Sequence, residues 1–152
     1  MYIAEKPTCI STVLGSSVSV CIFDRKKNYG GMNHFQLPFI GEKSKATALY
    51  GNVATVSLVR MMLENGSREK HLEAQIFGGA FNRMISKTDI GQENVRIAKK
   101  ALLRFRIQLV SEDVGGMIGR KIVFNTETAE LAVIRVEKLR KDDWYPYEGE
   151  RK

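Results

Sequence analysis

The sequence predicts an α+β fold for this chain of 152 residues. Short β-branched segments recur along the chain, and two longer segments repeat apolar residues at helical spacing. These elements follow one another in the order β-hairpin, helix, strand, helix, strand, β-hairpin. There is no internal repeat and no linker rich in proline or serine, so one domain is expected.

The first hairpin is predicted from two short strands. Residues 18–23 alternate and are rich in β-branched side chains. A turn-like stretch that contains Gly30-Gly31 leads to a second strand over residues 32–37, which Pro38 closes. The following residues, 40–47, are predicted to be a polar loop.

Two helices are predicted, one on each side of a strand over residues 72–77. The first covers about residues 52–64 and ends at Asn65-Gly66, which tolerate the left-handed conformation. The second covers about residues 92–106, with Thr88 or Asp89 as its cap. The apolar positions at helical spacing are Val53, Val56, Val59 and Leu63 in the first, and Val95, Ala98, Leu102 and Phe105 in the second. Another face of the second helix is basic, with Arg96, Lys99, Lys100 and Arg104.

The rest of the chain predicts a strand over 107–110, a loop over 111–119 and a second hairpin. In the hairpin, residues 121–124 pair with 131–136, and residues 125–128 supply the turn. We expect one domain over residues 1–140 and a charged, aromatic C-terminal tail over residues 141–152.

The composition is that of a globular protein with a core of its own. It is 43% hydrophobic and 27% charged, and contains two cysteines, too few for a disulfide scaffold. No apolar run approaches the roughly 20 residues of a membrane helix, and no signal peptide is visible. We therefore expect a reduced, cytoplasmic protein without membrane insertion. The net charge of +7 favours an acidic partner.

Several kinds of site are excluded by the motifs that the sequence lacks. There is no phosphate-binding loop, no G-x-G-x-x-G and no Cys-x-x-Cys or paired-histidine spacing, so no cofactor and no metal are expected. The basic residues are not interleaved with aromatics, which gives nucleic-acid binding little support. The three Gly-Gly pairs fit turns with positive φ, and alternatively backbone that closes around a pocket.

Several ordered motifs, taken together, resemble the CheD family of chemoreceptor glutamine deamidases. They extend over nearly the whole chain apart from the tail. The motifs are residues 10–21 (ISTVLGSSVSVC), 30–38 (GGMNHFQLP), 50–52 (YGN), 72–80 (LEAQIFGGA), 90–94 (IGQEN) and 111–116 (SEDVGG). The resemblance implies a mixed β-sandwich flanked by helices, and a cysteine hydrolase that converts receptor glutamines to glutamate.

The resemblance also implies a set of catalytic positions. The base is His34, and the residue that orients it falls on Ser11, although Thr12 is adjacent. The nucleophile position is Ser17, because this chain reads Gly-Ser-Ser where the family has Gly-Ser-Cys. Backbone N–H groups near Ser16 and Ser17 are candidates to hold the oxyanion.

Ser17 predicts that the chain as written is inactive or nearly so. A cysteine paired with histidine ionises readily, whereas a serine hydroxyl keeps its proton until a well-placed base removes it. Cys21 is predicted to be a small core residue and Cys9 an inert residue, so neither replaces the missing thiol. An engineered substitution and a natural divergence both remain open.

The partners that the resemblance implies are the cytoplasmic helices of chemoreceptors, which resemble acidic coiled coils, and a CheC-type phosphatase. The basic helix face then serves either to steer receptor docking or only as a solvated surface. The alternative to an enzyme is a non-catalytic chemotaxis adaptor that binds receptors, the phosphatase or both.

Overall fold

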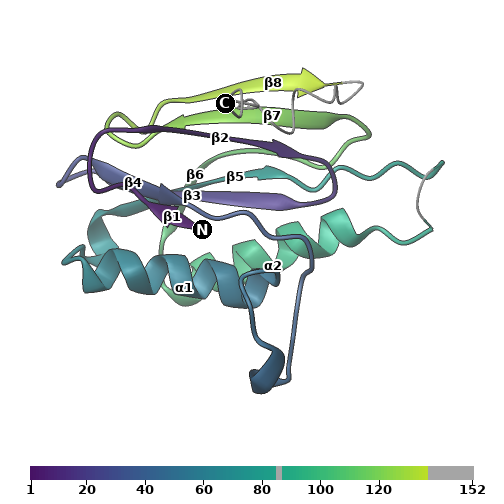
Figure 1. Cartoon of the computed structure of the whole chain (residues 1–152), viewed down its shortest axis with the longest axis horizontal. Coiled ribbons are helices and arrows are strands. Elements are labelled where there is room, and N and C mark those ends of the chain that lie inside the picture. The colour runs from purple at the N-terminus through teal and green to yellow at the C-terminus, as the bar shows by residue number, and fades with distance from the viewer. Residues whose placement is uncertain (85–86, 137–152) are drawn as a thin grey trace, which may run out of the picture.

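Successive side chains of each strand point to opposite faces of its sheet, and the chain forms two stacked sheets with helices on one outer face. The computed structural model describes residues 1–84 and 87–136 (Figure 1). Within them, the larger sheet has the order β1-β4-β3-β5-β6 and the smaller one the order β2-β7-β8. Both helices cover the face of the larger sheet that points away from the smaller one (Figure 1). The α+β prediction is confirmed, and the predicted tail over 141–152 lies outside the described residues.

The strands and helices have the following bounds. The strands are β1 (Tyr2–Ile3), β2 (Cys9–Leu14), β3 (Val18–Asp24), β4 (Tyr29–Met32), β5 (Leu72–Gly78), β6 (Gln108–Val114), β7 (Gly119–Asn125) and β8 (Leu131–Val136). The helices are α1 (Gly51–Glu64) and α2 (Ile90–Arg104), with short 3-10 turns at Lys43–Lys45 and Glu69–His71. All pairings are antiparallel except that of β5 with β6.

The central strand β3 is buried along its whole length and separates two hydrophobic clusters. Val18, Val20 and Ile22 pack toward the helices. Cys21 and Phe23 pack toward the smaller sheet. Odd-numbered residues of β3 therefore face the space between the sheets, because side chains alternate along a strand.

Both predicted hairpins, both helices and β5 are present, and Asp89 caps α2 by accepting a hydrogen bond from the Gln92 N–H. Gly66, at φ +84°, follows α1 as expected.

The buried face of α1 differs from the prediction. Only Val59 of the four predicted positions is buried, and the others are half-buried. The face that packs on the sheet is Gly51, Ala54, Thr55, Leu58, Val59 and Met62.

Three strand boundaries differ from the prediction. β2 was not apparent from the pattern; it pairs along its whole length with β7. β6 continues to Val114, through residues predicted to form a loop, because it pairs in parallel with β5. In the first hairpin β4 covers Tyr29–Met32 instead of the predicted 32–37, so Gly30-Gly31 belongs to the strand rather than to the turn. Residues 33–37 continue it only as isolated bridges at Phe35 and Leu37. A Cβ at Gly30 would lie 2.7 Å from the Ile22 carbonyl oxygen, and one at Gly31 would lie 2.8 Å from that of Tyr2.

Gly78, the last residue of β5, predicts a measurable stability difference. Its φ is +106°, and an added Cβ would clash with the Ser17 carbonyl oxygen. Gly115 also has a positive φ, +73°, but a Cβ there meets nothing within 4 Å. We expect Gly115→Ala to lower the free energy of unfolding by ~1–2 kcal/mol, the cost of the left-handed conformation. Gly78→Ala should lower it by a further ~1–3 kcal/mol because of overpacking.

Chemical denaturation of the two variants and the parent chain measures this difference. Equal losses in the two variants would contradict the crowding of Gly78 against Ser17.

Candidate active site

One end of the sandwich gathers three connections: the β2–β3 turn, the segment after β5 and the β6–β7 connection (Figure 1). The strand registers place them together. Val18 pairs with Gly78, Gly78 with Val114, and Leu14 with Arg120. The motifs that predicted the site therefore converge, although they are up to a hundred residues apart in the sequence.

The backbone of the β2–β3 turn is held by its carbonyl groups. The three carbonyl oxygens of residues 15–17 accept hydrogen bonds from Ala80 N at 2.8 Å, Asn94 Nδ2 at 2.9 Å and Gly79 N at 2.9 Å, respectively. Within the part of the chain that the structure describes, the N–H groups of Ser16 and Ser17 donate to no acceptor. Two adjacent free N–H groups beside residue 17 are the kind of donor that stabilises an oxyanion in acyl transfer.

His34 lies on an extension of β4 that stays in register with β3. Val18 and Phe35 exchange two backbone hydrogen bonds, and Asn33 N donates to Val20 O, each at 3.0 Å. The Asn33 side chain also accepts from Val20 N at 2.8 Å. The backbone on both sides of His34 is thus fixed to β3.

This register brings Ser17 and His34 onto the same face of the larger sheet. His34 lies opposite Ser19 in the antiparallel pairing. Ser17, two residues before Ser19, is therefore its diagonal neighbour on the adjacent strand, and the backbones of such residues are ~7–8 Å apart. Among the described residues no hydrogen bond joins the two side chains directly. In sites without bound substrate, hydrogen bonds between catalytic groups are often long and shorten only in the substrate complex.

The partner of the imidazole is Thr12. Its Oγ1 lies 2.9 Å from His34 Nδ1, which leaves Nε2 as the free ring nitrogen. Thr12 belongs to the smaller sheet and His34 to the larger one, so this hydrogen bond crosses the space between the sheets. It orients the ring in the way that a third residue orients the base of a catalytic triad.

Ser11, which the resemblance assigned to this task, does not contact His34. Along β2 the residues that pack into the inter-sheet cluster are Ile10 and Leu14, so the even-numbered positions point inward. Ser11 is odd-numbered and exposed. The adjacent Thr12, noted as the neighbour of the predicted position, occupies the inward face instead.

The environment of His34 favours its neutral form. Burial lowers the pKa of the half-buried imidazole below its ordinary value of 6.5, and the positive charge of the N-terminal amino group lowers it further. In the neutral tautomer whose Nδ1–H donates to Thr12 Oγ1, Nε2 carries no proton and is able to accept one at neutral pH.

Neither cysteine belongs to this arrangement. Cys21 is buried in the inter-sheet core, and burial raises the pKa of its thiol far above the ordinary value, so it stays protonated. Cys9 is exposed, at an odd-numbered position of β2, on the face away from His34. The structure agrees with the sequence-based prediction that neither replaces a thiol at position 17.

The Gly-Gly pairs fall into two groups. Gly78-Gly79 and Gly115-Gly116 all have positive φ and lie beside the site, whereas Gly30-Gly31 lies within a strand. Gly115 N donates to Gly78 O, and Phe81 N donates to Gly116 O. The positive φ values of these two pairs confirm the interpretation as turn glycines. Backbone is crowded at Gly78 and Gly79, whereas a Cβ at Gly115 or Gly116 would meet nothing within 4 Å.

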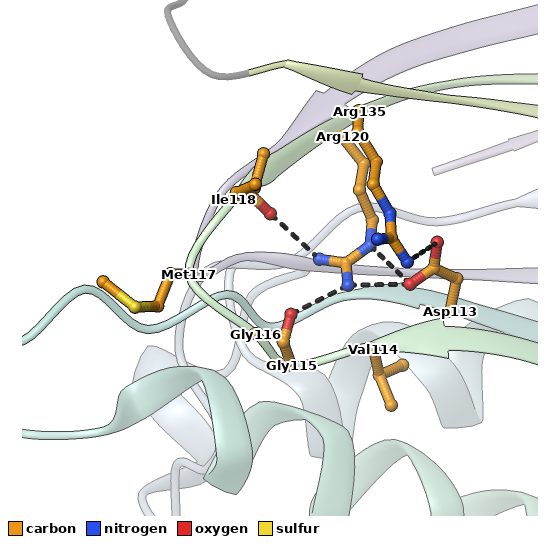
Figure 2. Close-up of a pocket in the computed structure, with 8 residues that line it drawn as sticks. All are labelled: Asp113, Val114, Gly115, Gly116, Met117, Ile118, Arg120 and Arg135. Atoms are coloured by element: carbon orange, nitrogen blue, oxygen red, sulfur yellow. Dashed lines mark hydrogen bonds and ion pairs between the residues drawn. The ribbon is translucent and has the colours of Figure 1, made fainter.

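A buried arginine holds the second of these glycine pairs (Figure 2). Arg120, 4% exposed, donates to Asp113 Oδ1 at 2.8 and 3.0 Å, to Gly115 O at 2.8 Å and to Ile118 O at 3.3 Å. The Arg120 side chain lowers the pKa of the Asp113 carboxyl. Asp113 falls in the predicted loop over 111–119, but it is a strand residue whose charge is compensated by Arg120.

A groove of about 710 Å³ lies beside α2, on the helical side of the larger sheet. Its apolar part includes Phe39, whose side chain is 61% exposed. Its charged part comes from α2: Glu93, Arg96, Lys100 and Arg104. Arg96 pairs with Glu93, whereas Lys100 and Arg104 make no ion pair within the described residues. Lys99 lies outside the groove and binds Glu112 at 2.6 Å.

Sequence reasoning missed two side chains that shape the site. Thr12 was one position from the predicted residue, and no signal in the sequence separates the two, because β2 itself was not apparent from the pattern. Asn94 is the last residue of the motif at residues 90–94, but no catalytic or structural role was predicted for it. Nothing in the sequence indicates that it contacts residues 16 and 36, which lie 78 and 58 positions away.

Among the described residues, no helix has both the length and the hydropathy needed to cross a membrane. No group of three or more histidine, cysteine, aspartate or glutamate side chains in that part of the chain is arranged to hold a metal ion.

Comparison with known proteins supports the resemblance. A family model described as CheD, chemotactic sensory transduction, matches residues 37–135. Three relatives have names that begin with "Probable chemoreceptor glutamine deamidase CheD". That of Trichlorobacter lovleyi is 43% identical over 83% of this chain and 80% of its own length. That of Sulfurimonas denitrificans is 35% identical over 91% of this chain and 90% of its own length. That of Anaeromyxobacter dehalogenans is 41% identical over 82% of this chain and 74% of its own length.

The family model covers more than half of the chain, and these relatives align with about four-fifths of it or more. The model begins after His34, so it covers both helices and β5, β6, β7 and most of β8, whereas β1 to β4 precede it. The relatives align over longer stretches of the chain. The chain belongs to the CheD family.

Proposed function

We propose that this site is that of a protein-glutamine deamidase which acts on chemoreceptors in the cytoplasm, and that Ser17 leaves the present chain with little or no activity. The hydrogen bond between Thr12 and His34, on the face that residue 17 shares, is the observation that carries the proposal. The names of the relatives supply the substrate class.

With cysteine at position 17 the reaction is acyl transfer. His34 accepts the thiol proton, and the sulfur attacks the carboxamide carbon of glutamine. The carbon–nitrogen bond breaks, and ammonia leaves with a proton from His34. Water, activated by the same imidazole, then hydrolyses the thioester to glutamate and restores the thiol. The Ser16 and Ser17 N–H groups stabilise the oxyanion, and Thr12 keeps Nε2 directed at the reacting atoms.

Serine at position 17 weakens the first step. Its hydroxyl is a poor nucleophile until its proton is removed during the attack. Oxygen is also smaller than sulfur, so in a site shaped for a thiol it lies too far from the base and from the carbonyl carbon.

Restoring the thiol tests this account. Ser17→Cys should raise the rate of deamidation of receptor fragments by about 100-fold or more, since small displacements of reacting groups cost about that much. Mass spectrometry should detect a gain of about one dalton per site as amide becomes acid.

Two controls accompany the measurement. Ser11→Cys makes the same replacement on the outward face of β2 and should give no gain. Ser17→Cys combined with His34→Ala should lose the gain. Equal activity of the two serine-to-cysteine variants, or no deamidation by Ser17→Cys, contradicts the proposed site.

The lowered pKa of His34 has a pH consequence in the present chain. Between that lowered pKa and about 6.5, the unfolded chain binds a proton at His34 that the folded chain does not. The free energy of unfolding should therefore fall as the pH decreases below about 6.5. Denaturation at pH 7 and pH 5 should show a smaller loss in His34→Gln, which lacks the titrating group. Equal losses would contradict a depressed pKa, as would an NMR titration midpoint above 6.5.

The proposed partner is a cytoplasmic receptor helix, which docks in the groove beside α2. The apolar wall accommodates the apolar face of a helix, and Lys100 and Arg104 attract acidic side chains. Asn94, which donates to Ser16 O in the β2–β3 turn, follows Glu93 of the groove wall by one residue and precedes Ile97 by three, so the groove and the turn adjoin the same stretch of α2.

Charge removal in the groove tests this docking in the Ser17→Cys background. Lys100→Gln/Arg104→Gln should lower kcat/KM for receptor fragments about 5- to 10-fold at low salt, and less at high salt because ions screen the attraction. Lys26→Gln/Lys70→Gln removes the same charge outside the groove, at two exposed lysines, and should change kcat/KM less than twofold. Equal effects of the two double variants would contradict docking in the groove.

Ser17 itself favours a second candidate function, that of an adaptor without catalysis which binds receptors or a CheC-type phosphatase. A pull-down of the present chain with each partner, beside an ammonia-release assay of Ser17→Cys, separates the two functions. Binding by the present chain, with no ammonia released by Ser17→Cys, is the result expected of an adaptor.

A further inference from the structure

Asn94, on the second turn of α2, joins the two halves of the candidate site. Its side-chain nitrogen donates to Ser16 O and to Gln36 O, each at 2.9 Å. Ser16 precedes the nucleophile position, and Gln36 follows His34 by two residues. The Asn94 amide thus joins the segment that carries the nucleophile position to the segment that carries the imidazole.

The energetics of this amide do not explain its presence as a contribution to stability. Asn94 is fully buried, and its Oδ1 has no hydrogen-bond partner within the described residues. An unsatisfied buried acceptor costs ~1–3 kcal/mol, which offsets much of what its two hydrogen bonds contribute at ~0.5–1.5 kcal/mol each. The orientation is nevertheless fixed, because a flipped amide would place Oδ1 against two carbonyl oxygens.

Close helix packing places Asn94 where it can make both bonds. A Cβ at Gly91 would clash with Gly79 O, and Gly79 itself has a φ of +68°. The first turn of α2 therefore lies directly against the backbone that follows β5. Asn94 comes three residues later, beside the β2–β3 turn.

From this geometry we infer that Asn94 is a positioning residue, which sets the separation between residue 17 and His34 in the reaction proposed above, on which the inference rests. By holding Ser16 O, it also fixes the peptide group that carries the Ser17 N–H, and so keeps that N–H turned away from backbone acceptors. It touches neither the nucleophile nor the base.

The test uses Ser17→Cys with Cys9→Ser, so that within the described residues the introduced thiol is the only one outside the apolar core. Alkylation by iodoacetamide over a range of pH measures the ionisation of this introduced thiol without any receptor substrate. In this background the midpoint should lie below ~8.5, the ordinary pKa of a thiol, because His34 is close.

Asn94→Leu keeps the shape of the side chain and removes both donors. The alkylation midpoint should rise toward ~8.5. The kcat for receptor fragments should fall about 10- to 100-fold, with KM changed less than twofold, since the reacting groups are displaced but the groove is not. Asn94→Ala, which leaves room for water beside the two carbonyls, gives the same comparison if the leucine variant folds poorly.

Thr126→Val is the matched control. Thr126 is also buried and makes two hydrogen bonds to the backbone of Thr8, away from the site. It should lower Tm without moving the alkylation midpoint or kcat. If the Asn94 variants behave like Thr126→Val, Asn94 is only structural and the inference fails. A midpoint near 8.5 with Asn94 intact contradicts instead the Cys–His pair of the proposed function.

Discussion

The site depends on one constraint. The pairing of β3 does not stop at its first residue, Val18, but continues backwards along the chain to Ser17. Ser17 O accepts from Gly79 N on one side, and Val18 exchanges hydrogen bonds with Phe35 on the other. The residue that stands at the nucleophile position is therefore part of a central, buried sheet, although it is the last residue of a turn. A site built on a sheet holds its geometry more closely than one built on free loops.

Much of the fold follows from local patterns, and the errors have long-range causes. The hairpins, both helices and β5 are visible in the spacing of apolar and turn residues. The second half of β6 is polar, at Ser111, Glu112 and Asp113, and is a strand because β5 pairs with it and ion pairs with Arg120 and Lys99 compensate its charges. The buried face of α1 is set by how the helix lies on the sheet, which four valine and leucine positions did not reveal.

The candidate site divides in the same way. Ser17 and His34 stand within motifs whose order and spacing are specific, so their positions were predictable. The choice between Ser11 and Thr12 was not, because moving one residue along a strand exchanges its two faces, and the register of β2 is set by pairing with β7. Asn94 is invisible at the level of sequence, since its contacts are with segments 78 and 58 residues away.

The hydrogen bond between Thr12 and His34 spans the two layers of the sandwich, so the aim of the imidazole depends on how tightly those layers close. Ile122, the partner of Thr12 in the β2–β7 ladder, and Phe124 are buried between the sheets and keep the layers at their distance. A change in that interior alters the distance between the sheets and with it the orientation of the ring. The apolar interior is therefore part of what positions the imidazole.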